Sequence, residues 1–513
     1  MKRILTTLAL CIVIAGPAAA ATPSQFIAKL YTEALGRIPD QTGWQAMLNQ
    51  FSGGSCSQPL LKGAGQSAYL STEYANLGYD NAARILTLYR GILNREPDDG
   101  AVDWWMAYLD AGHTWAEVVD EFLDSAEFWD LSGTICQGVP YSFDVPHGSF
   151  TDLHPVIDLP TSGTGFVGTQ AQLQSALNAT PSGGTLLLRQ KAVVRLTSVL
   201  IIPSGVTLAT TGNPGHAQYA LMGRLVRNSA FTTPAVQLNN GAKLKSVWVD
   251  GQRNIVGRVG DGMNVQLLGG TNTEVSSSVL SNTAGWTTMH TMGSNLGIAC
   301  TSNKILNNLI TVYSSAHTGT VINGQYPWSD GLSISCENAT VDNNEVVDAT
   351  DVGIIIFRAD PAVQKSVAKN NRVLASGNSA FAALAYDGQD FAPANPSFSG
   401  ASFNNNTLWT SPTAHFDLGI SVGTRAWFGN ATSATGGAVT ANTTGSQTAR
   451  VDTGIAVAGM LNANVQSNTL TVTLVSNLGN CPSATVGAAV SAGGASGTIQ
   501  PYTDQDYFAC VGH

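Results

Sequence analysis

A unit of the form apolar-x-x-Asn-x-apolar recurs through the second half of the chain and restricts its possible folds. Repeats that each have an apolar strand and a polar corner bury their apolar residues by stacking into a solenoid. Stacked coils lie about 4.8 Å apart, a spacing at which inward Asn side chains can hydrogen-bond into a ladder. A β-sandwich has no reason to repeat Asn at one corner, so we predict a solenoid of parallel strands. The Asn units are centred on Asn308, Asn344, Asn371, Asn406 and Asn468, and Val247 and Ser278 fit the same frame.

A second pattern, Gly-apolar-x-apolar, marks the start of a strand in each coil. Its unequal spacing is consistent with insertions on one face of a solenoid. Before the first unit, residues 171–212 contain a short helix and then short apolar runs separated by Gly and Pro, which resembles the N-terminal cap of a right-handed parallel β-helix. We therefore expect residues 167–480 to form this fold and residues 481–513 to form a C-terminal tail or cap. The glycines of the second pattern are Gly262, Gly297, Gly331, Gly353, Gly419 and Gly454.

Residues 22–137 contain a different internal repeat. Residues 26–48 recur as residues 84–109, so that Arg37-Ile38-Pro39-Asp40 aligns with Arg95-Glu96-Pro97-Asp98. Apolar residues recur at helical intervals in both copies. Each Pro-Asp pair is expected to end one helix and to cap the next. The segment is thus predicted to be a small all-α domain, which makes the chain a two-domain α + β protein.

This helical segment resembles the LGRxPD repeat of unknown function found in exported bacterial proteins, which is distantly similar to phycobilisome linkers. The resemblance implies an accessory or attachment module without chemistry of its own. Residues 138–166 are rich in Pro, Gly, Ser and Asp and are predicted to be a linker.

The first 21 residues are typical of a secretory signal peptide. Lys2 and Arg3 precede an apolar stretch at residues 5–16, and small residues at 18–21 offer a cleavage site. The apolar stretch is shorter than the roughly 20 residues that span a bilayer. We expect a protein that is secreted, periplasmic or on the cell surface, and not embedded in a membrane.

Six cysteines remain after removal of the signal peptide, and an even number in an exported chain indicates disulfides. Grouping them by region gives the simplest pairing. The expected bonds are Cys56–Cys136, Cys300–Cys336 and Cys481–Cys510.

The chain is acidic, with a formal net charge of −10. A nucleic-acid partner is excluded because it needs a basic face to neutralise its phosphates. A polyanionic substrate is disfavoured unless a local Arg cluster overrides the overall charge. No cofactor or metal is expected, although Asp-lined corners could supply oxygen ligands to calcium.

Asp330 and Asp351 are the strongest candidates for chemistry. They lie 21 residues apart, about one coil, so their carboxyls should be neighbours on one corner. Two carboxyls this close cannot ionise independently, and one pKa should be raised. A protonated carboxyl beside an ionised one is what cleavage of a glycosidic bond requires.

The surrounding segment, residues 328–358, is similar to the polygalacturonase type of pectin-lyase-like β-helix glycoside hydrolases. In that family an N-T-D-G turn is followed about one coil later by an Asp-Asp pair. Ser329-Asp330-Gly331 corresponds to the turn and Thr350-Asp351-Val352 to the pair, with Val in place of the second Asp. The family's later Gly-His-Gly and Arg-x-Lys motifs have no matching form here. The resemblance implies the fold and a carbohydrate substrate more than polygalacturonase activity itself.

Other candidate residues come from the end of the following strand and from insertions between coils. Arg358 follows an apolar strand and could bind a sugar acid or serve as the cation of a lyase. His290 and His317 lie in long excursions, where binding residues concentrate. Aromatic side chains in these segments suit stacking against sugar rings. The predicted substrate-binding residues are Trp286, His290, His317, Tyr326 and Trp328.

The sequence favours an exported polysaccharide-degrading enzyme that hydrolyses glycosidic bonds in a groove along the β-helix. Its partner would be a polysaccharide or a cell-surface glycan. One alternative is a polysaccharide lyase that uses Arg358, Lys365 or His290 for β-elimination. The other is a non-catalytic surface adhesin or glycan-binding protein, in which the Asp corner is purely structural.

Overall fold

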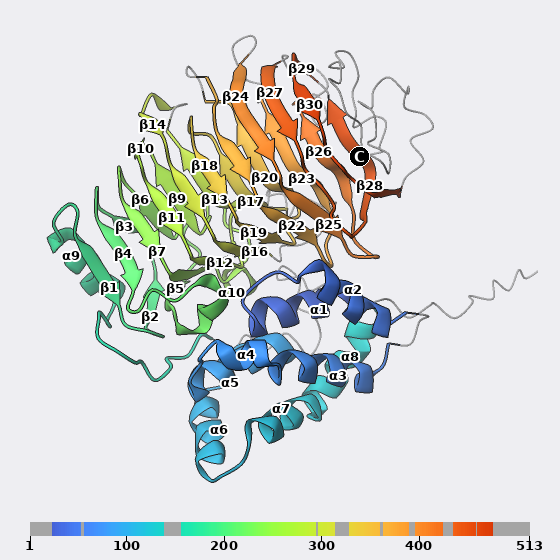
Figure 1. Cartoon of the computed structure of the whole chain (residues 1–513). Coiled ribbons are helices and arrows are strands. Elements are labelled where there is room, and N and C mark those ends of the chain that lie inside the picture. Colours follow the sequence, from blue (N-terminus) through green and yellow to red (C-terminus); the bar gives the residue numbers. More distant parts are fainter. Residues whose placement is uncertain are drawn as a thin grey trace, which may run out of the picture.

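The computed structural model describes residues 23–52, 56–137, 155–293, 296–312, 328–359, 363–388, 396–423, 434–457 and 459–475. A group of helices is followed by a long stack of parallel strands (Figure 1). The predicted fold class, an all-α domain followed by a right-handed parallel β-helix, is confirmed. The predicted signal peptide, Cys481, Cys510, His317 and Tyr326 lie outside the described residues.

Most coils of the β-helix contribute one strand to each of three sheets, and the strand pairs within these sheets are parallel. Sheet 1 contains β1 (Thr185–Leu188), β4 (Thr207–Thr210), β7 (Lys243–Lys245), β11 (Glu274–Ser276), β15 (Lys304–Leu306), β18 (Thr340–Asp342), β21 (Val367–Lys369), β24 (Ser397–Asn404), β27 (Ala434–Thr440), β29 (Met460–Leu461) and β30 (Asn464–Gln466). Sheet 2 contains β2 (Val193–Leu196), β5 (Gly223–Arg227), β8 (Val247–Asp250), β12 (Val279–Ser281), β16 (Leu309–Thr311), β19 (Glu345–Val347), β22 (Arg372–Ala375) and β25 (Thr407–Thr410).

Sheet 3 carries most of the candidate residues. It contains β3 (Leu200–Ile202), β6 (Val236–Leu238), β9 (Val265–Leu268), β13 (Thr287–Met292), β17 (Asp330–Ile334), β20 (Val352–Phe357), β23 (Ala380–Asp387), β26 (Phe416–Val422), β28 (Ala449–Val457) and β31 (Val472–Leu474). A further short pair joins β10 (Gly270–Thr271) to β14 (Cys300–Thr301), and helix α9 (Gln170–Ala179) packs at the first coil. Side chains that point inward from all three sheets form one continuous apolar core.

The predicted Asn ladder is confirmed at the corner between sheets 1 and 2. The side-chain amide of Asn308 donates to the Oδ1 atom of Asn344 at 2.9 Å, and the same 2.9 Å bond links every later step through Asn371, Asn406, Asn442 and Asn468. Asn442 escaped the sequence pattern because Thr444, and not an apolar residue, follows it two positions later. Each of these amides both donates and accepts, so the buried column is satisfied without charge.

The helical region contains α1 (Ser24–Lys29), a π-helical turn (Leu30–Ala34), α2 (Gln41–Gln50), α3 (Gln58–Tyr69), α4 (Thr72–Asn76), α5 (Asn81–Ile92), α6 (Ala101–Asp110), α7 (Trp115–Leu123) and α8 (Ala126–Cys136). Asp40 caps α2 as expected, since its carboxylate accepts the N–H of Gly43. The equivalent expectation for Asp98 is wrong, because Gly100 is the N-cap of α6 and Asp98 pairs with Arg95 instead. The disulfides Cys56–Cys136 and Cys300–Cys336 are confirmed.

The helices cover the outer face of sheet 2 (Figure 1). Arg224 of β5 pairs with Glu96, and its guanidinium lies 3.7 Å from the ring centroid of Trp248 on β8. Arg90 of α5 lies over the same ring at 4.7 Å and pairs with Glu33. Buried ion pairs with several partners are strongly directional. They therefore hold the helical region against sheet 2 in one defined orientation. Apolar residues of sheet 2 that pack against the helices include Trp248, Val279, Leu309, Val347, Leu374 and Trp409.

The short helix α10 (Arg253–Val256) lies between β8 and β9, and a 3₁₀ turn (His216–Leu221) precedes β5. Within the predicted linker, residues 155–166 pack on the first coil, where Phe166 N donates to Leu187 O at 2.7 Å. In the described part of the chain, no helix is long and apolar enough to cross a membrane.

Candidate carboxylate site

Asp330 and Asp351 lie at the corner where the chain enters sheet 3. Leu332 of β17 pairs with Ile354 of β20, so this coil advances by 22 residues and not 21. Asp330 is therefore level with Val352, while the N–H of Asp351 donates to Ser329 O at 3.1 Å. The two aspartates are diagonal neighbours on adjacent strands, offset by one residue.

Asp330 is 3% exposed. Its Oδ2 atom accepts a hydrogen bond from Ser333 Oγ at 2.7 Å, and its Oδ1 atom accepts the N–H of Val352 at 3.0 Å. Burial raises the pKa of Asp330 to about 7, and the negative charge of Asp387 adds to this rise. The two hydrogen bonds and the positive charge of Arg258 act in the opposite direction, because they stabilise the anion.

Asp351 is partly exposed, and its environment differs. Burial, followed by the negative charges of Asp330 and Asp387, raises the pKa of Asp351 well above its ordinary value, and only the charge of Arg258 opposes this. Among the described residues, no donor hydrogen-bonds to the Asp351 carboxylate to favour its anion. The hydrogen bonds to Asp330 thus favour its anion, whereas the environment of Asp351 opposes ionisation, and the two carboxyls titrate as a pair.

Sequence reasoning missed Asp387 and Arg258. Asp387 ends β23, level with Phe357 of β20. The Gly-apolar-x-apolar pattern does not occur in this coil, because Ala383 stands at the position that Gly353 has in the preceding coil. The pattern therefore did not identify β23 or the aspartate at its end. Reading residues 380–386 as the missing strand would have revealed it. Arg258 follows α10, and its guanidinium donates to the carbonyl oxygens of Gly260 and Ala284 at 2.9 and 3.2 Å. Nothing in its local sequence marks it.

Aromatic rings flank the carboxylates along the axis of the solenoid. Trp286 lies one coil before Asp330, whose N–H donates to Trp286 O at 2.9 Å. On the other side, Phe381 of β23 is level with Asp351, and the ring of Trp328 lies 5.4 Å from that of Phe381. Trp286 and Trp328 are both partly exposed.

His290 of β13 lies near the pair on sheet 3, directly beside Ser333 in the strand register. Its Nε2 atom is 2.9 Å from Ser335 Oγ, and its ring meets Trp286 edge to face at 5.0 Å. Burial lowers the pKa of His290 to about 4, so the imidazole is neutral at neutral pH.

Arg358 lies one strand length from the two aspartates, beside Asp387, whose carbonyl oxygen accepts the N–H of Arg358 at 3.1 Å. Arg358 follows the last residue of β20, whereas Asp351 precedes the first. At about 3.3 Å per residue, these positions are roughly 23 Å apart along the strand. Lys365 is exposed on the loop before β21.

One family model matches the chain: a domain of unknown function (DUF4214) over residues 64–132. No curated protein matches the sequence. Endo-xylogalacturonan hydrolase from Aspergillus tubingensis is similar in structure, with 14% identity, a TM-score of 0.34, and coverage of 64% of this chain and 96% of the hydrolase. The Dettilon tailspike protein has 14% identity and a TM-score of 0.36, with 69% and 70% covered. The surface adhesin PfbA of Streptococcus pneumoniae has 11% identity and a TM-score of 0.34, with 61% and 91% covered. Similarities at this level of identity and TM-score do not assign a function to this chain.

Proposed function

We propose that this protein is an exported glycoside hydrolase in which Asp351 donates a proton and Asp330 is its ionised partner. The observation that carries the proposal is the unequal environment of two neighbouring carboxyls with raised pKa values. Pairs of carboxyls whose environments separate their protonation states are suited to glycosidic bond cleavage.

The roles follow from the contacts of each group. Asp351 is the more exposed of the two, and no described donor favours its anion, so we assign it the proton that the leaving oxygen of the sugar takes up. Asp330 accepts two hydrogen bonds that favour its anion, so it takes up the proton lost by the attacking water. The bond between the anomeric carbon and the leaving oxygen breaks, and a bond to the water oxygen forms.

The aromatic flanks favour a sugar chain as the substrate. The exposed parts of Trp286 and Trp328 lie on either side of the carboxylates, and aromatic faces pack well on the apolar faces of sugar rings. A chain laid along the solenoid axis would contact both.

The test is incubation of the purified protein with a panel of glycans, while reducing ends and ultraviolet absorbance are followed on the same samples. New reducing ends without absorbance are expected, and Asp351→Asn should slow their formation by about 10²–10⁴-fold. Asp348→Asn is the matched control: Asp348 is also buried with a raised pKa, but it accepts hydrogen bonds from Gln25 and Ser376 at the contact with the helices. Full activity in Asp351→Asn would refute the assignment, and absorbance that rises with the reducing ends would indicate a lyase.

A non-catalytic glycan-binding protein is the second candidate, and one observation favours it. Asp330 accepts the backbone N–H of Val352 much as Asp348 accepts those of Ser376 and Gly377, and the contacts of Asp348 are structural. Saturable binding of a glycan, with no product from any member of the panel, would support this function over hydrolysis.

A further inference from the structure

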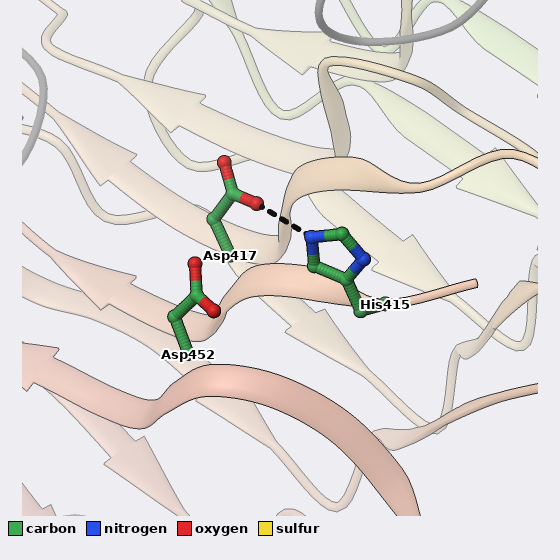
Figure 2. A group of neighbouring side chains, drawn as sticks. All are labelled: His415, Asp417 and Asp452. Atoms are coloured by element: carbon green, nitrogen blue, oxygen red, sulfur yellow. Dashed lines mark ion pairs between the residues drawn. The ribbon is translucent and has the colours of Figure 1, made fainter. Parts of the chain in front are cut away.

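A second cluster of ligand-type side chains lies on the same corner of sheet 3, further along the solenoid. His415 immediately precedes β26, Asp417 is the second residue of β26, and Asp452 lies on β28. Phe416 pairs with Val451 and Leu418 with Thr453, so Asp417 and Asp452 are level on adjacent strands. Figure 2 shows their carboxylates next to each other, with the imidazole of His415 beside that of Asp417.

The three side chains already have the spacing of a ligand set. His415 Nε2 lies 3.2 Å from Asp417 Oδ1, and one ligand atom from each residue lies within 4.8 Å of the others. Bonds of about 2.0–2.2 Å to one ion place neighbouring donor atoms roughly 3–4.4 Å apart. Small side-chain adjustments would therefore close the three groups around one ion.

The imidazole is oriented from outside the cluster. His415 Nδ1 lies 2.9 Å from Ser379 Oγ, and the same hydroxyl accepts the backbone N–H of His415 at 3.0 Å. These two contacts come from the preceding coil and direct Nε2 toward the carboxylates. A hydrogen bond at the second ring nitrogen is the usual support of a metal-binding histidine.

The two carboxylates of the cluster are buried, whereas the imidazole is partly exposed to solvent. Asp417 and Asp452 are 3% and 6% exposed, whereas the side chain of His415 is 28% exposed. Two buried carboxylates on adjacent strands repel each other, and a cation between them would offset that repulsion. The exposed edge of His415 would let an ion enter.

We propose that His415, Asp417 and Asp452 form a binding site for a divalent transition-metal ion of the Zn²⁺ or Mn²⁺ type. One imidazole and two carboxylates suit these ions, whereas Ca²⁺ takes oxygen ligands alone. The proposal differs from the expectation, drawn from the sequence, of no metal or of calcium. In the register of sheet 3, Asp417 is level with Phe381, and Phe381 is level with Asp351. The proposed metal site therefore lies two strands, about 10 Å, from Asp351 along the axis of the solenoid. It is independent of whether Asp351 is catalytic.

The experiment is calorimetric titration of the full exported protein, prepared without a polyhistidine tag and stripped with a chelator, with ZnCl₂, MnCl₂ and CaCl₂ separately. One Zn²⁺ or Mn²⁺ per chain is expected, bound more tightly than Ca²⁺. Ser379→Ala, which keeps all three ligands, should weaken binding about 10–100-fold. His415→Gln and Asp417→Asn should weaken it further. His415→Gln alters a partly exposed side chain, so it serves even if Asp417→Asn does not fold.

His113→Gln is the matched control, because His113 lies 3.8 Å from one carboxylate, that of Glu117, and is exposed on the helical region. This variant should bind the ion as the unaltered protein does. Absence of saturable binding, tighter binding of Ca²⁺ than of Zn²⁺, or loss of binding in His113→Gln with retention in His415→Gln would each overturn the proposal. The first result would mean that the three side chains only hold adjacent coils together.

Discussion

Two corners of the same solenoid stack polar side chains coil upon coil, and they do so with opposite consequences. At the corner between sheets 1 and 2, Asn308 through Asn468 form a neutral ladder in which every amide both donates and accepts. At the corner that enters sheet 3, Asp330 and Asp351 are neighbours that cannot both ionise easily. The same strand spacing therefore makes stacked amides stabilising and opposes the ionisation of neighbouring carboxyls, because a carboxylate accepts but does not donate.

Asp351→Asn tests this comparison most directly, because it places a neutral amide at the corner that now holds two carboxyls. We expect glycan cleavage to fall by about 10²–10⁴-fold, since general acid catalysis contributes that much. The folded state should be at least as stable, because a buried acid is replaced by a neutral amide. Initial rates and thermal unfolding of the same preparations would check both. A parallel loss of rate and of unfolding temperature would point to a structural role.

Asn371→Asp makes the reverse change in the ladder. The new carboxylate could not donate to Val341 O or to Asn406 Oδ1, which the amide of Asn371 now contacts at 3.0 and 2.9 Å. We expect a loss of about 3–5 kcal/mol in the free energy of unfolding near neutral pH, as for an uncompensated buried charge. Urea unfolding at pH 5 and pH 8 would show a smaller loss at the lower pH. Equal losses at both would mean that charge is not the cause.

The pH dependence of stability should come in part from the acidic corner. The folded-state pKa of Asp330 is raised to about 7, above the value of about 3.9 in an unfolded chain. The folded protein thus binds more protons, and its free energy of unfolding should fall as the pH rises from about 4 to about 7. Asp330→Asn should reduce this slope, and the part that remains would come from Asp351, whose pKa is also raised. Denaturant unfolding across this range measures the slope.

Trp286→Ala should have the smallest effect. Loss of one stacking ring is expected to raise KM by roughly fivefold, in line with about 1 kcal/mol for an aromatic contact, while kcat changes little. Phe at this position should restore most of the affinity, although it loses the 2.9 Å hydrogen bond from Trp286 Nε1 to Asp261. Steady-state kinetics on one cleaved glycan would separate KM from kcat. A fall in kcat alone would place Trp286 in support of the carboxylates.

Much of the fold was predictable because its signals are local and repeated. The apolar-x-x-Asn-x-apolar pattern predicted the ladder. It missed only Asn442, because no apolar residue stands two positions after it. Two disulfides followed from grouping cysteines by region. The candidate site was predictable only in outline. Asp387 sits in a coil without its glycine marker, and Arg258 approaches from an irregular segment that no pattern describes.

The sequence by itself determined the solenoid, its amide corner and the helical nature of the first domain, because each depends on spacing within one repeat. The tertiary structure decided which carboxyls meet and which face is covered. The register of β17 on β20 sets the one-residue offset between Asp330 and Asp351, and the register of β26 on β28 brings Asp417 level with Asp452, beside His415. The helices cover sheet 2 through contacts such as Arg224 with Glu96, residues 128 positions apart in the chain. Burial and charge at such sites arise from distant segments, so no local pattern encodes them.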